Sequence, residues 1–525
     1  MKRLRLTVAC LASTAMGFFT AGMMEARAAN DVVRTHYDGV TNDLLTAGLG
    51  KTGLGSPVPP GFVDALNPTA EELRRSAIYN NYRALIDPTP GGGYGTLYGP
   101  NVAADGTVTT SEGKIAGTEY IAYEKHSGGR ARVTIMVQVP DSFDPSNACI
   151  ITAPSSGSRG VYGAIATAGE WGLKRGCAVA YSDKGTGTGA HNLQNNTVNR
   201  MRGERADAAA ARDDANFIAD ISASQRAAFN TATPNRFAFK HAHSQLNPEK
   251  DWGQNVLRSI EFAFDMLNDQ FRRRGMQFGK HNTIVIASSV SNGGGASVRA
   301  VEQDNKGLID GVAVGEPNVN PKFRANFSIV QGSQPPFFAH SRPLFDYTTL
   351  VNVFQGCASL APANAAAGLN LAGSAPRCAD LHAAGLLTAT TLAAQATEAQ
   401  KVINDFGILT EQNLVQPGYW FANVPQSISV TYANAYGRFS VLDNVCAYSM
   451  AAALAGVPAP LAATNEAQIF GTSNGIPPTS GLSLINNAAP GGPREDRAST
   501  PSQNLDGALA CARSQPATTP SREHA

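Results

Sequence analysis

The residue with the clearest chemical potential is a serine on a predicted strand-to-helix turn. Ser291 lies in the sequence SVSNG, residues 289–293, after the β-branched run 283–287 and before a predicted helix that begins near Gly294. A serine in this setting sits on a strained turn at the carboxyl end of a strand, where small neighbours leave its hydroxyl accessible. Ser289 stands where such turns usually have glycine. The pattern predicts acyl transfer through Ser291.

Backbone groups around this turn are predicted to stabilise an oxyanion. The N–H of Asn292 lies at the start of the predicted helix, where the helix dipole adds partial positive charge. Glycines 293–295 would let this helix approach the sheet closely. A second donor usually comes from the loop after an earlier strand. Ser155 or Ser156, in the loop PSSGSRG at residues 154–160, is the expected donor, and we assign Ser156.

Other patterns have simpler explanations than a ligand site. Residues 291–295 lack the glycine and lysine spacing of nucleotide-binding loops, and GTGTG at 185–189 predicts a flexible loop. A serine at such a turn can also be only a helix N-cap. His241 and His243, with Asp251, could suggest a metal site, but surface histidines before a helix are the favoured interpretation. No metal and no cofactor is expected.

The elements that must position these residues follow a β-α-β rhythm. Short apolar or β-branched runs predict strands at residues 132–139, 149–153, 177–181, 283–287 and 311–314. Apolar residues at helical spacing predict helices at residues 69–86, 161–175, 252–273 and 296–303. Alternation of this kind predicts an α/β fold with a doubly wound, mostly parallel sheet.

The composition changes along the chain and suggests a division into regions. The predicted regions are a signal peptide at 1–28, a core at 29–316 with a polar insertion at 190–246, a helical cap or lid at 317–486 and a disordered tail at 487–525. The insertion holds a predicted helical piece near 208–219, and the cap a long helix at 381–404. The tail contains only Leu505 and Leu509 as large apolar residues and so has little to bury.

The N-terminus predicts export. A basic start, a diluted apolar run and the small-x-small triplet ending at Ala28 are typical of a cleaved signal peptide, and no later stretch is apolar enough to anchor the chain. Six cysteines follow: Cys149, Cys177, Cys357, Cys378, Cys446 and Cys511. An oxidising compartment permits three disulfides, although the sequence leaves the pairing open. Cys357 and Cys378 could close a loop, whereas Cys149 and Cys177 could equally be buried thiols.

Charge and hydropathy exclude several classes of protein. Lysine and arginine number 42 against 41 aspartate and glutamate, for a net charge of +1, which argues against nucleic acid as a main partner. Hydrophobic residues make up 43% of the chain, enough for a sizeable core. The expected partner is a small-molecule ester.

Five segments together resemble the secreted D-(−)-3-hydroxybutyrate oligomer hydrolases. These segments are residues 132–140, 153–165, 169–177, 182–187 and 288–295, and the resemblance extends to about residue 510. It implies an α/β-hydrolase-type serine esterase that cleaves short 3-hydroxybutyrate oligomers, including the dimer. The family's nucleophile falls on Ser291. Two alternatives are another secreted esterase of this fold, of the tannase or feruloyl type, and a non-catalytic remnant or binding protein.

The resemblance also implies a departure. In α/β-hydrolases the catalytic acid and histidine follow the serine in the chain, on loops after the last strands. After Ser291 only His340, His382 and His524 remain, and none follows a β-branched strand with an aspartate-containing turn. We therefore expect a C-terminally truncated or frameshifted chain that lacks its acid and base.

Overall fold

The structure is a computed structural model of the chain. It describes residues 32–124, 131–319, 326–330, 332–333, 335–338, 342–367, 375–473, 475, 477–496 and 505–513. The predicted signal peptide lies outside these ranges. Within them, no helix combines the length and the apolar character needed to cross a bilayer.

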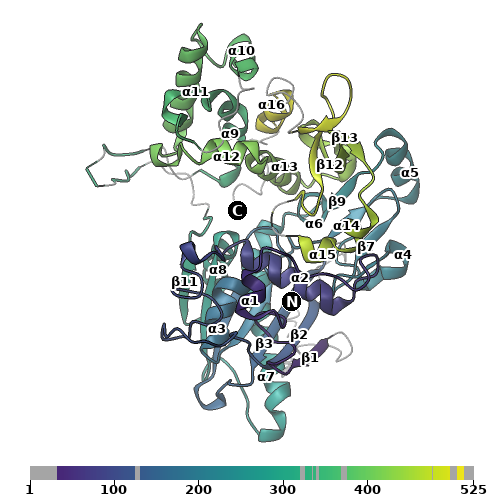
Figure 1. The fold of residues 1–525 in the computed structure, drawn as a ribbon, viewed down its shortest axis with the longest axis vertical. Helices are drawn as coiled ribbons and strands as arrows, with labels where there is room; N and C mark the ends of the chain where they lie inside the picture. The colour runs from purple at the N-terminus through teal and green to yellow at the C-terminus, as the bar shows by residue number, and fades with distance from the viewer. Residues whose placement is uncertain are drawn as a thin grey trace, which may run out of the picture.

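A seven-stranded sheet forms the centre of the core (Figure 1). Its strands lie in the order β1 (Val33–Tyr37), β2 (Gly117–Glu124), β3 (Val133–Pro140), β5 (Ala178–Ser182), β4 (Cys149–Pro154), β10 (Ile284–Val290) and β11 (Gly311–Gly315). The last four are parallel to one another, while β1, β2 and β3 join them through antiparallel pairings. The predicted strands are all present, but the sheet is mixed rather than mostly parallel. β1 and β2 were not predicted from the sequence; β2 is followed directly by β3 with no described helix between them, outside the α/β rhythm.

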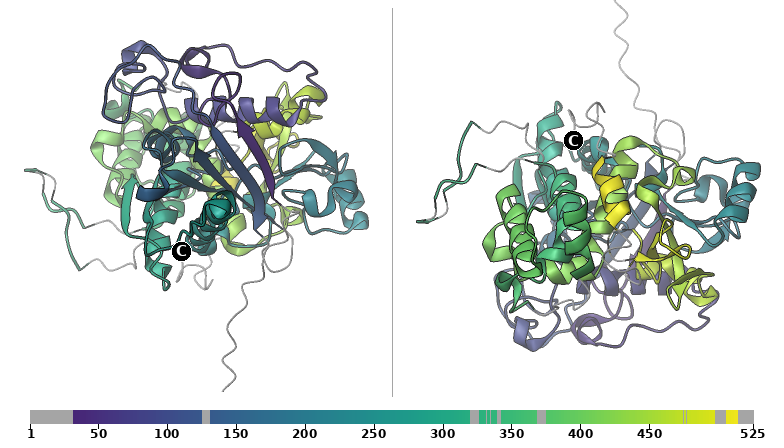
Figure 2. Two further views of the ribbon diagram at one scale, coloured as in Figure 1. Left: turned by 90° about the horizontal axis from the view of Figure 1, so that it is seen from below. Right: turned by 90° about the horizontal axis from the view of Figure 1, so that it is seen from above.

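Helices cover both faces of this sheet, as the two further views of the ribbon illustrate (Figure 2). On one face, α2 (Ala70–Arg83) packs with α3 (Glu170–Lys174) and its preceding π-helical turn over buried side chains of β4 and β5. On the other face, α7 (Pro248–Phe271) and α8 (Ser291–Gln303) pack against β3, β4 and β10. Thr69 caps α2 through a reciprocal capping box with Glu72. The helix predicted at 161–175 is shorter and begins later than expected.

The predicted polar insertion is built around a small sheet. Its four strands lie in the order β8 (Arg205–Asp207), β7 (Thr197–Asn199), β6 (Ala190–Asn192) and β9 (Phe237–Phe239). The accompanying helices are α4 (Ala208–Ala211), α5 (Ala223–Ala232) and α6 (Lys240–His243). The helix predicted near 208–219 is only the single turn of α4. Strands of three residues carry too little periodicity to be predicted.

The cap, residues 342–486, begins as a helical bundle and ends as a second small sheet. Its helices are α9 (Leu344–Ala358), α10 (Ala375–Ala383), α11 (Leu392–Phe406), α12 (Gln416–Phe421), α13 (Val424–Gly437), α14 (Ala463–Ala467) and α15 (Ile469–Thr472). The helix predicted at 381–404 is two helices, α10 and α11. Strands β13 (Val457–Ala459), β12 (Tyr448–Leu454), β14 (Ser483–Asn486) and β15 (Arg494–Glu495) form the sheet, so the cap contains strands that the predicted helical cap did not include.

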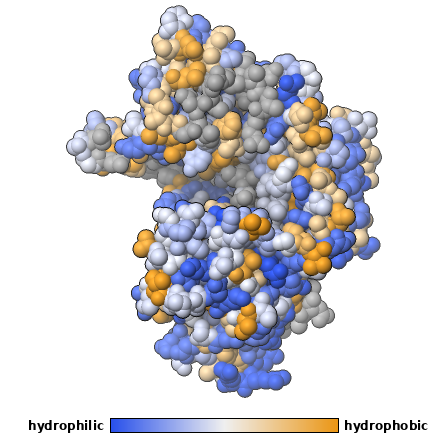
Figure 3. Space-filling view, viewed as in Figure 1, coloured by the Kyte–Doolittle hydropathy of each residue, from blue (hydrophilic) through white to orange (hydrophobic). Residues whose placement is uncertain are grey.

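On the face drawn in Figure 3, the surface is hollowed between the cap helices and the core below them. α8 lies on the side of the core toward the cap (Figure 1). Among the short elements outside these layers, α1 (Gly50–Gly55) packs beside α2.

The predicted disordered tail is partly ordered. β15 pairs with β14, and α16 (Leu505–Arg513) buries Leu505, Ala508 and Cys511 against the cap. A disulfide between Cys446 and Cys511 fastens α16 to the start of the second sheet. The disulfide adds stability to a tail that has few large apolar residues to bury. Residues 497–504 and 514–525 lie outside the described ranges.

The other four cysteines after the signal region also pair. Cys149 bonds Cys177 at the amino ends of the adjacent strands β4 and β5, and Cys357 bonds Cys378 between α9 and α10. The loop closure considered for Cys357 and Cys378 is thereby confirmed, and the free-thiol interpretation of the other pair was wrong.

Removing the Cys446–Cys511 bond is expected to release α16. The 65-residue separation corresponds to about 4 kcal/mol in the chain-entropy account of disulfides. In a Cys446→Ala/Cys511→Ala protein, trypsin should cut after Arg513 at least about tenfold faster than in the wild type. Limited proteolysis with mass spectrometry measures this rate. A Cys149→Ala/Cys177→Ala protein is the control and should keep α16 protected; equal cleavage in both variants would contradict the expectation.

Candidate active site

Ser291 stands at the junction of β10 and α8, as the sequence predicts. It is the first residue of α8 and has φ of +54°, in the left-handed region that non-glycine residues rarely adopt. A positive φ of this kind is strained and persists where the surroundings enforce it. The side chain is exposed, and among the described residues its hydroxyl makes no hydrogen bond. The hydroxyl is therefore available to an incoming group.

The three glycines after Ser291 are required by the packing of α8. A Cβ on Gly293 would lie 2.2 Å from Ser289 Oγ and 2.3 Å from the carbonyl oxygen of Pro154. A Cβ on Gly295 would lie 2.4 Å from the carbonyl oxygen of Asn318. Ser289 itself donates its hydroxyl to Pro154 O at 2.7 Å, which links the end of β10 to the end of β4. The close approach predicted for this helix is confirmed.

The two predicted oxyanion donors lie on adjacent segments. Asn292 is in the first turn of α8, whose N–H groups have no partner within the helix. Ser155 is not available, because its N–H donates to Ser182 O at 2.8 Å. Ser156, buried at the start of the loop after β4, remains as the candidate donor. The catalytic part assigned to these donors stays a prediction.

A buried lysine fixes the peptide planes of this loop. Lys184 Nζ donates to Ser155 O at 2.5 Å and to Gly157 O at 2.9 Å. In a trans peptide the next N–H points away from the carbonyl, so this contact directs the Ser156 N–H away from Lys184. Asp183 forms a fully buried ion pair with Lys240 at 2.7 Å. The segment 185–189 is buried and held by these charges, which contradicts the flexible loop expected from its glycines.

Most histidines of the described chain are unsuited to proton transfer at Ser291. They are His36, His191, His241, His243, His281 and His382. Burial lowers the pKa of His191 to about 4 and that of His243 to about 3, and both accept hydrogen bonds from backbone N–H groups. His382 is exposed in the cap, where its Nδ1 bonds Leu387 O at 3.2 Å. His340 and His524 lie outside the described residues.

His241 differs from these, and the interpretation of His241 and His243 as surface residues was wrong. The exposed fraction of His241 is 2%. Its Nδ1 lies 2.5 Å from Ser158 Oγ and its Nε2 lies 2.5 Å from Glu249 Oε1. A serine, a histidine and a carboxylate therefore form one hydrogen-bonded series. No spacing along the chain indicates this series, because the three residues come from the β4 loop, α6 and α7.

This series is connected to the Ser291 turn through the cap. Tyr432 of α13 packs edge-on against the His241 ring, with ring centroids 5.6 Å apart. Its hydroxyl lies 3.4 Å from Nδ2 of Asn292, the residue after Ser291. Burial raises the pKa of Tyr432, as does nearby Glu249, so its hydroxyl stays neutral. Within the described ranges, no three or more histidine, cysteine, aspartate or glutamate side chains gather as a metal site.

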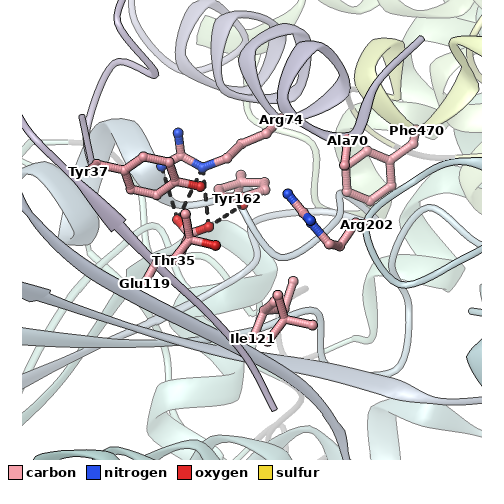
Figure 4. Close-up of a pocket in the computed structure, with 10 residues that line it drawn as sticks. Thr35, Tyr37, Ala70, Arg74, Glu119, Ile121, Tyr162, Arg202 and Phe470 are labelled. Carbon is pink, nitrogen blue, oxygen red and sulfur yellow. Dashed lines mark hydrogen bonds and ion pairs between the residues drawn. The ribbon is translucent and has the colours of Figure 1, made fainter. Parts of the chain in front are cut away.

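A separate polar pocket lies between α2 and the sheet (Figure 4). Arg74 and Glu119 face each other there at 3.0 Å, both buried, and Tyr162 donates to Glu119 at 2.9 Å. Burial opposes the charge of Arg74, but Glu119 outweighs it and raises the arginine's pKa. The remaining guanidinium donors reach Asn42 and backbone carbonyls. This pair ties α2 to β2 and takes no part in the Ser291 site.

Most of the chain is similar in sequence to one family of known proteins. A sequence model described as 3HB-oligomer hydrolase (3HBOH) matches residues 13–523. Relatives named D-(−)-3-hydroxybutyrate oligomer hydrolase are 56% identical in Polaromonas naphthalenivorans, 53% in Albidiferax ferrireducens and 50% in Burkholderia thailandensis. The alignments span 88%, 89% and 91% of this chain and 67%, 68% and 71% of the relatives. No solved structure matches.

These matches assign the chain to the carboxylic ester hydrolases. More particularly, the chain belongs to the 3HB-oligomer hydrolase family.

Adding a methyl group at Gly293 is expected to disrupt the turn. A Gly293→Ala protein must move α8 away from Pro154 and Ser289, at a cost of about 1–3 kcal/mol for overpacking. Its thermal unfolding midpoint should fall and its esterase activity should drop with it. Gly311→Ala is the control, because nothing lies within 4 Å of a Cβ there. Equal midpoints for the two variants would show that α8 accommodates the methyl group.

The buried Lys184 predicts a pH-dependent stability. Burial lowers its pKa from 10.5 to about 7, despite the opposing charges of Asp183 and Glu249. The unfolded chain keeps the higher pKa, so it binds more protons between about pH 7 and pH 10, and the free energy of unfolding should rise with pH there. The difference in thermal midpoint between wild type and Lys184→Met should therefore grow over this window.

The control for this experiment is Lys250→Met, which changes an exposed lysine. Its midpoint difference from the wild type should stay constant with pH. A difference for Lys184→Met that is flat, or that shrinks as the pH rises, would contradict a depressed pKa at Lys184.

Proposed function

We propose that this protein hydrolyses the ester bonds of 3-hydroxybutyrate oligomers through an acyl-enzyme on Ser291. The substrate class rests on the names of its relatives. The mechanism rests on one observation: an exposed serine with φ of +54° at the carboxyl end of a parallel strand, whose hydroxyl makes no hydrogen bond within the described part of the chain. The proposal includes an α/β-hydrolase-type fold and export from the cytoplasm.

The strand order supports the proposed fold class. The four parallel strands β5, β4, β10 and β11 carry helices on both faces, and the first three strands extend the sheet in antiparallel fashion. Ligands of open α/β sheets bind beyond the carboxyl ends of the strands. Both the Ser291 turn and the loop with Ser156 are at these ends, since Ser289 contacts Pro154. The hollow between core and cap leaves room for a substrate on this side (Figure 3).

The proposed reaction has two halves. Ser291 Oγ attacks the ester carbonyl carbon, and the carbonyl oxygen becomes an oxyanion that accepts hydrogen bonds from the N–H groups of Asn292 and Ser156. The C–O bond breaks, the alcohol product takes the serine proton, and an acyl-enzyme remains. Water then attacks the acyl carbon and releases the hydroxybutyrate acid. No step requires a metal or a cofactor.

Replacing Ser291 by alanine tests this proposal. Ser291→Ala should lower kcat/KM on 3-hydroxybutyrate dimers by at least about 10³-fold, because only binding and oxyanion contacts remain. The far-ultraviolet circular dichroism and thermal midpoint should match the wild type, since the side chain is exposed. Ser224→Ala, a change at an exposed serine of α5, is the control. Comparable turnover by Ser291→Ala would refute the nucleophile, and a preference for aromatic esters over dimers would refute the substrate class.

A further inference from the structure

The mechanism proposed for Ser291 needs a base. One buried cluster contains a histidine and a carboxylate, the residue types of a base and the acid that orients it. Ser158, His241 and Glu249 are 4%, 2% and 7% exposed, and their side chains form a single hydrogen-bonded series. Of the described histidines, His241 is the one that is buried with both a hydroxyl and a carboxylate as partners. His36, which also meets an acid, is exposed and lies 3.8 Å from Asp141.

The partners define the proton arrangement on the imidazole. A carboxylate accepts, so Nε2 carries the proton and donates to Glu249 Oε1. Nδ1 then holds a lone pair and accepts the hydroxyl proton of Ser158. This is the arrangement in which a serine hydroxyl can give up its proton, with the carboxylate placed to stabilise the imidazolium that results. Ser158 Oγ keeps its own lone pairs for a further donor.

Two series of contacts connect the cluster to the Ser291 turn. Along the sheet, Ser158 is in the loop that follows Pro154, and Pro154 O accepts a hydrogen bond from Ser289 Oγ. Through the cap, Tyr432 contacts both the His241 ring and the Asn292 side chain.

We propose that His241 is the base that serves Ser291, that Glu249 orients it, and that the hydroxyl of Ser158 passes the proton between them. This inference rests on the proposed function, because it requires Ser291 to be the nucleophile. Here the histidine precedes the serine in the chain, so the relay does not require a histidine after Ser291.

Two proton transfers accompany the attack of Ser291. As Ser291 Oγ forms its bond to the ester carbon, its proton moves to Ser158 Oγ and the Ser158 proton moves to Nδ1 of His241. The ester C–O bond breaks, and the leaving alkoxide takes a proton back along the same path, which returns His241 to its neutral form. Deacylation repeats the sequence with water in place of Ser291.

The charges around His241 come from several elements. Glu249 lies on α7, and Lys184, after β5, interacts electrostatically with Glu249, Asp183, Arg159 and Lys240. Tyr432 on α13 contributes a neutral hydroxyl. A base must be unprotonated to act, so the relay predicts that acylation slows as the pH falls.

The test follows acylation of the full chain by a fluorophosphonate ester probe, with peptide mass spectrometry to identify the labelled serine. His241→Gln should lower the labelling rate about 10³-fold at pH 8 and abolish the low-pH limb of the rate profile. Glu249→Gln should lower it about 10²-fold while the fold is kept. His243→Gln is the matched control: it changes a buried histidine of the same helix that accepts a hydrogen bond from the Phe239 N–H, and should stay within about threefold of the wild type with the same limb.

A direct test of the middle member is Ser158→Ala. It should slow labelling of Ser291 about as much as Glu249→Gln does, and hydrolysis of 3-hydroxybutyrate dimers should fall in parallel. Thermal midpoints of all variants within a few degrees of the wild type would exclude loss of fold as the cause.

The outcomes separate the relay from the proposed function. If Ser291 is labelled in His241→Gln at the wild-type rate with an unchanged low-pH limb, the relay is overturned and Ser291 stands. If the label falls on Ser158 and requires His241, the cluster acts as its own nucleophilic site, and both Ser291 as nucleophile and the relay to it are overturned. A folded wild type that neither labels nor hydrolyses dimers would overturn both.

Discussion

The close contact of α8 with the carboxyl ends of β4 and β10 is the constraint around which the site is organised. Backbone atoms of Pro154 and Asn318 occupy the space that side chains at positions 293 and 295 would need. This contact holds Ser291 in a left-handed conformation, because the helix must start immediately after β10 ends. The packing of a whole helix supports the strain at Ser291, whose side chain stays exposed.

Buried ionisable side chains restrict the loop after β4, as the packing of α8 restricts the Ser291 turn. The amino group of Lys184 donates to two carbonyl groups of the β4 loop, while Lys240 forms an ion pair with Asp183. Burying these groups costs free energy, which is recovered only if the hydrogen bonds are kept. The loop therefore has little freedom, and the direction of the Ser156 N–H follows from where Lys184 lies. Rigid donors are what oxyanion stabilisation requires.

The cap is a structural part of the site as well as its cover. Tyr432 from α13 touches His241 of the insertion and Asn292 of the core, so three regions that are distant in sequence meet at one ring. The disulfide between Cys446 and Cys511 keeps the end of the described chain on this same cap. A substitution in the cap can therefore affect the site without reaching the serine.

The sequence by itself determined five strands of the central sheet (β3, β4, β5, β10 and β11), the turn with Ser291 and the need for its glycines, since each depends on neighbours within a few residues. It did not determine β1 and β2, the small sheets or the ordered α16, whose formation depends on long-range pairing and a disulfide. Above all, only the tertiary structure brought Ser158, His241 and Glu249 together, because a hydrogen-bonded series drawn from three elements has no spacing along the chain to reveal it.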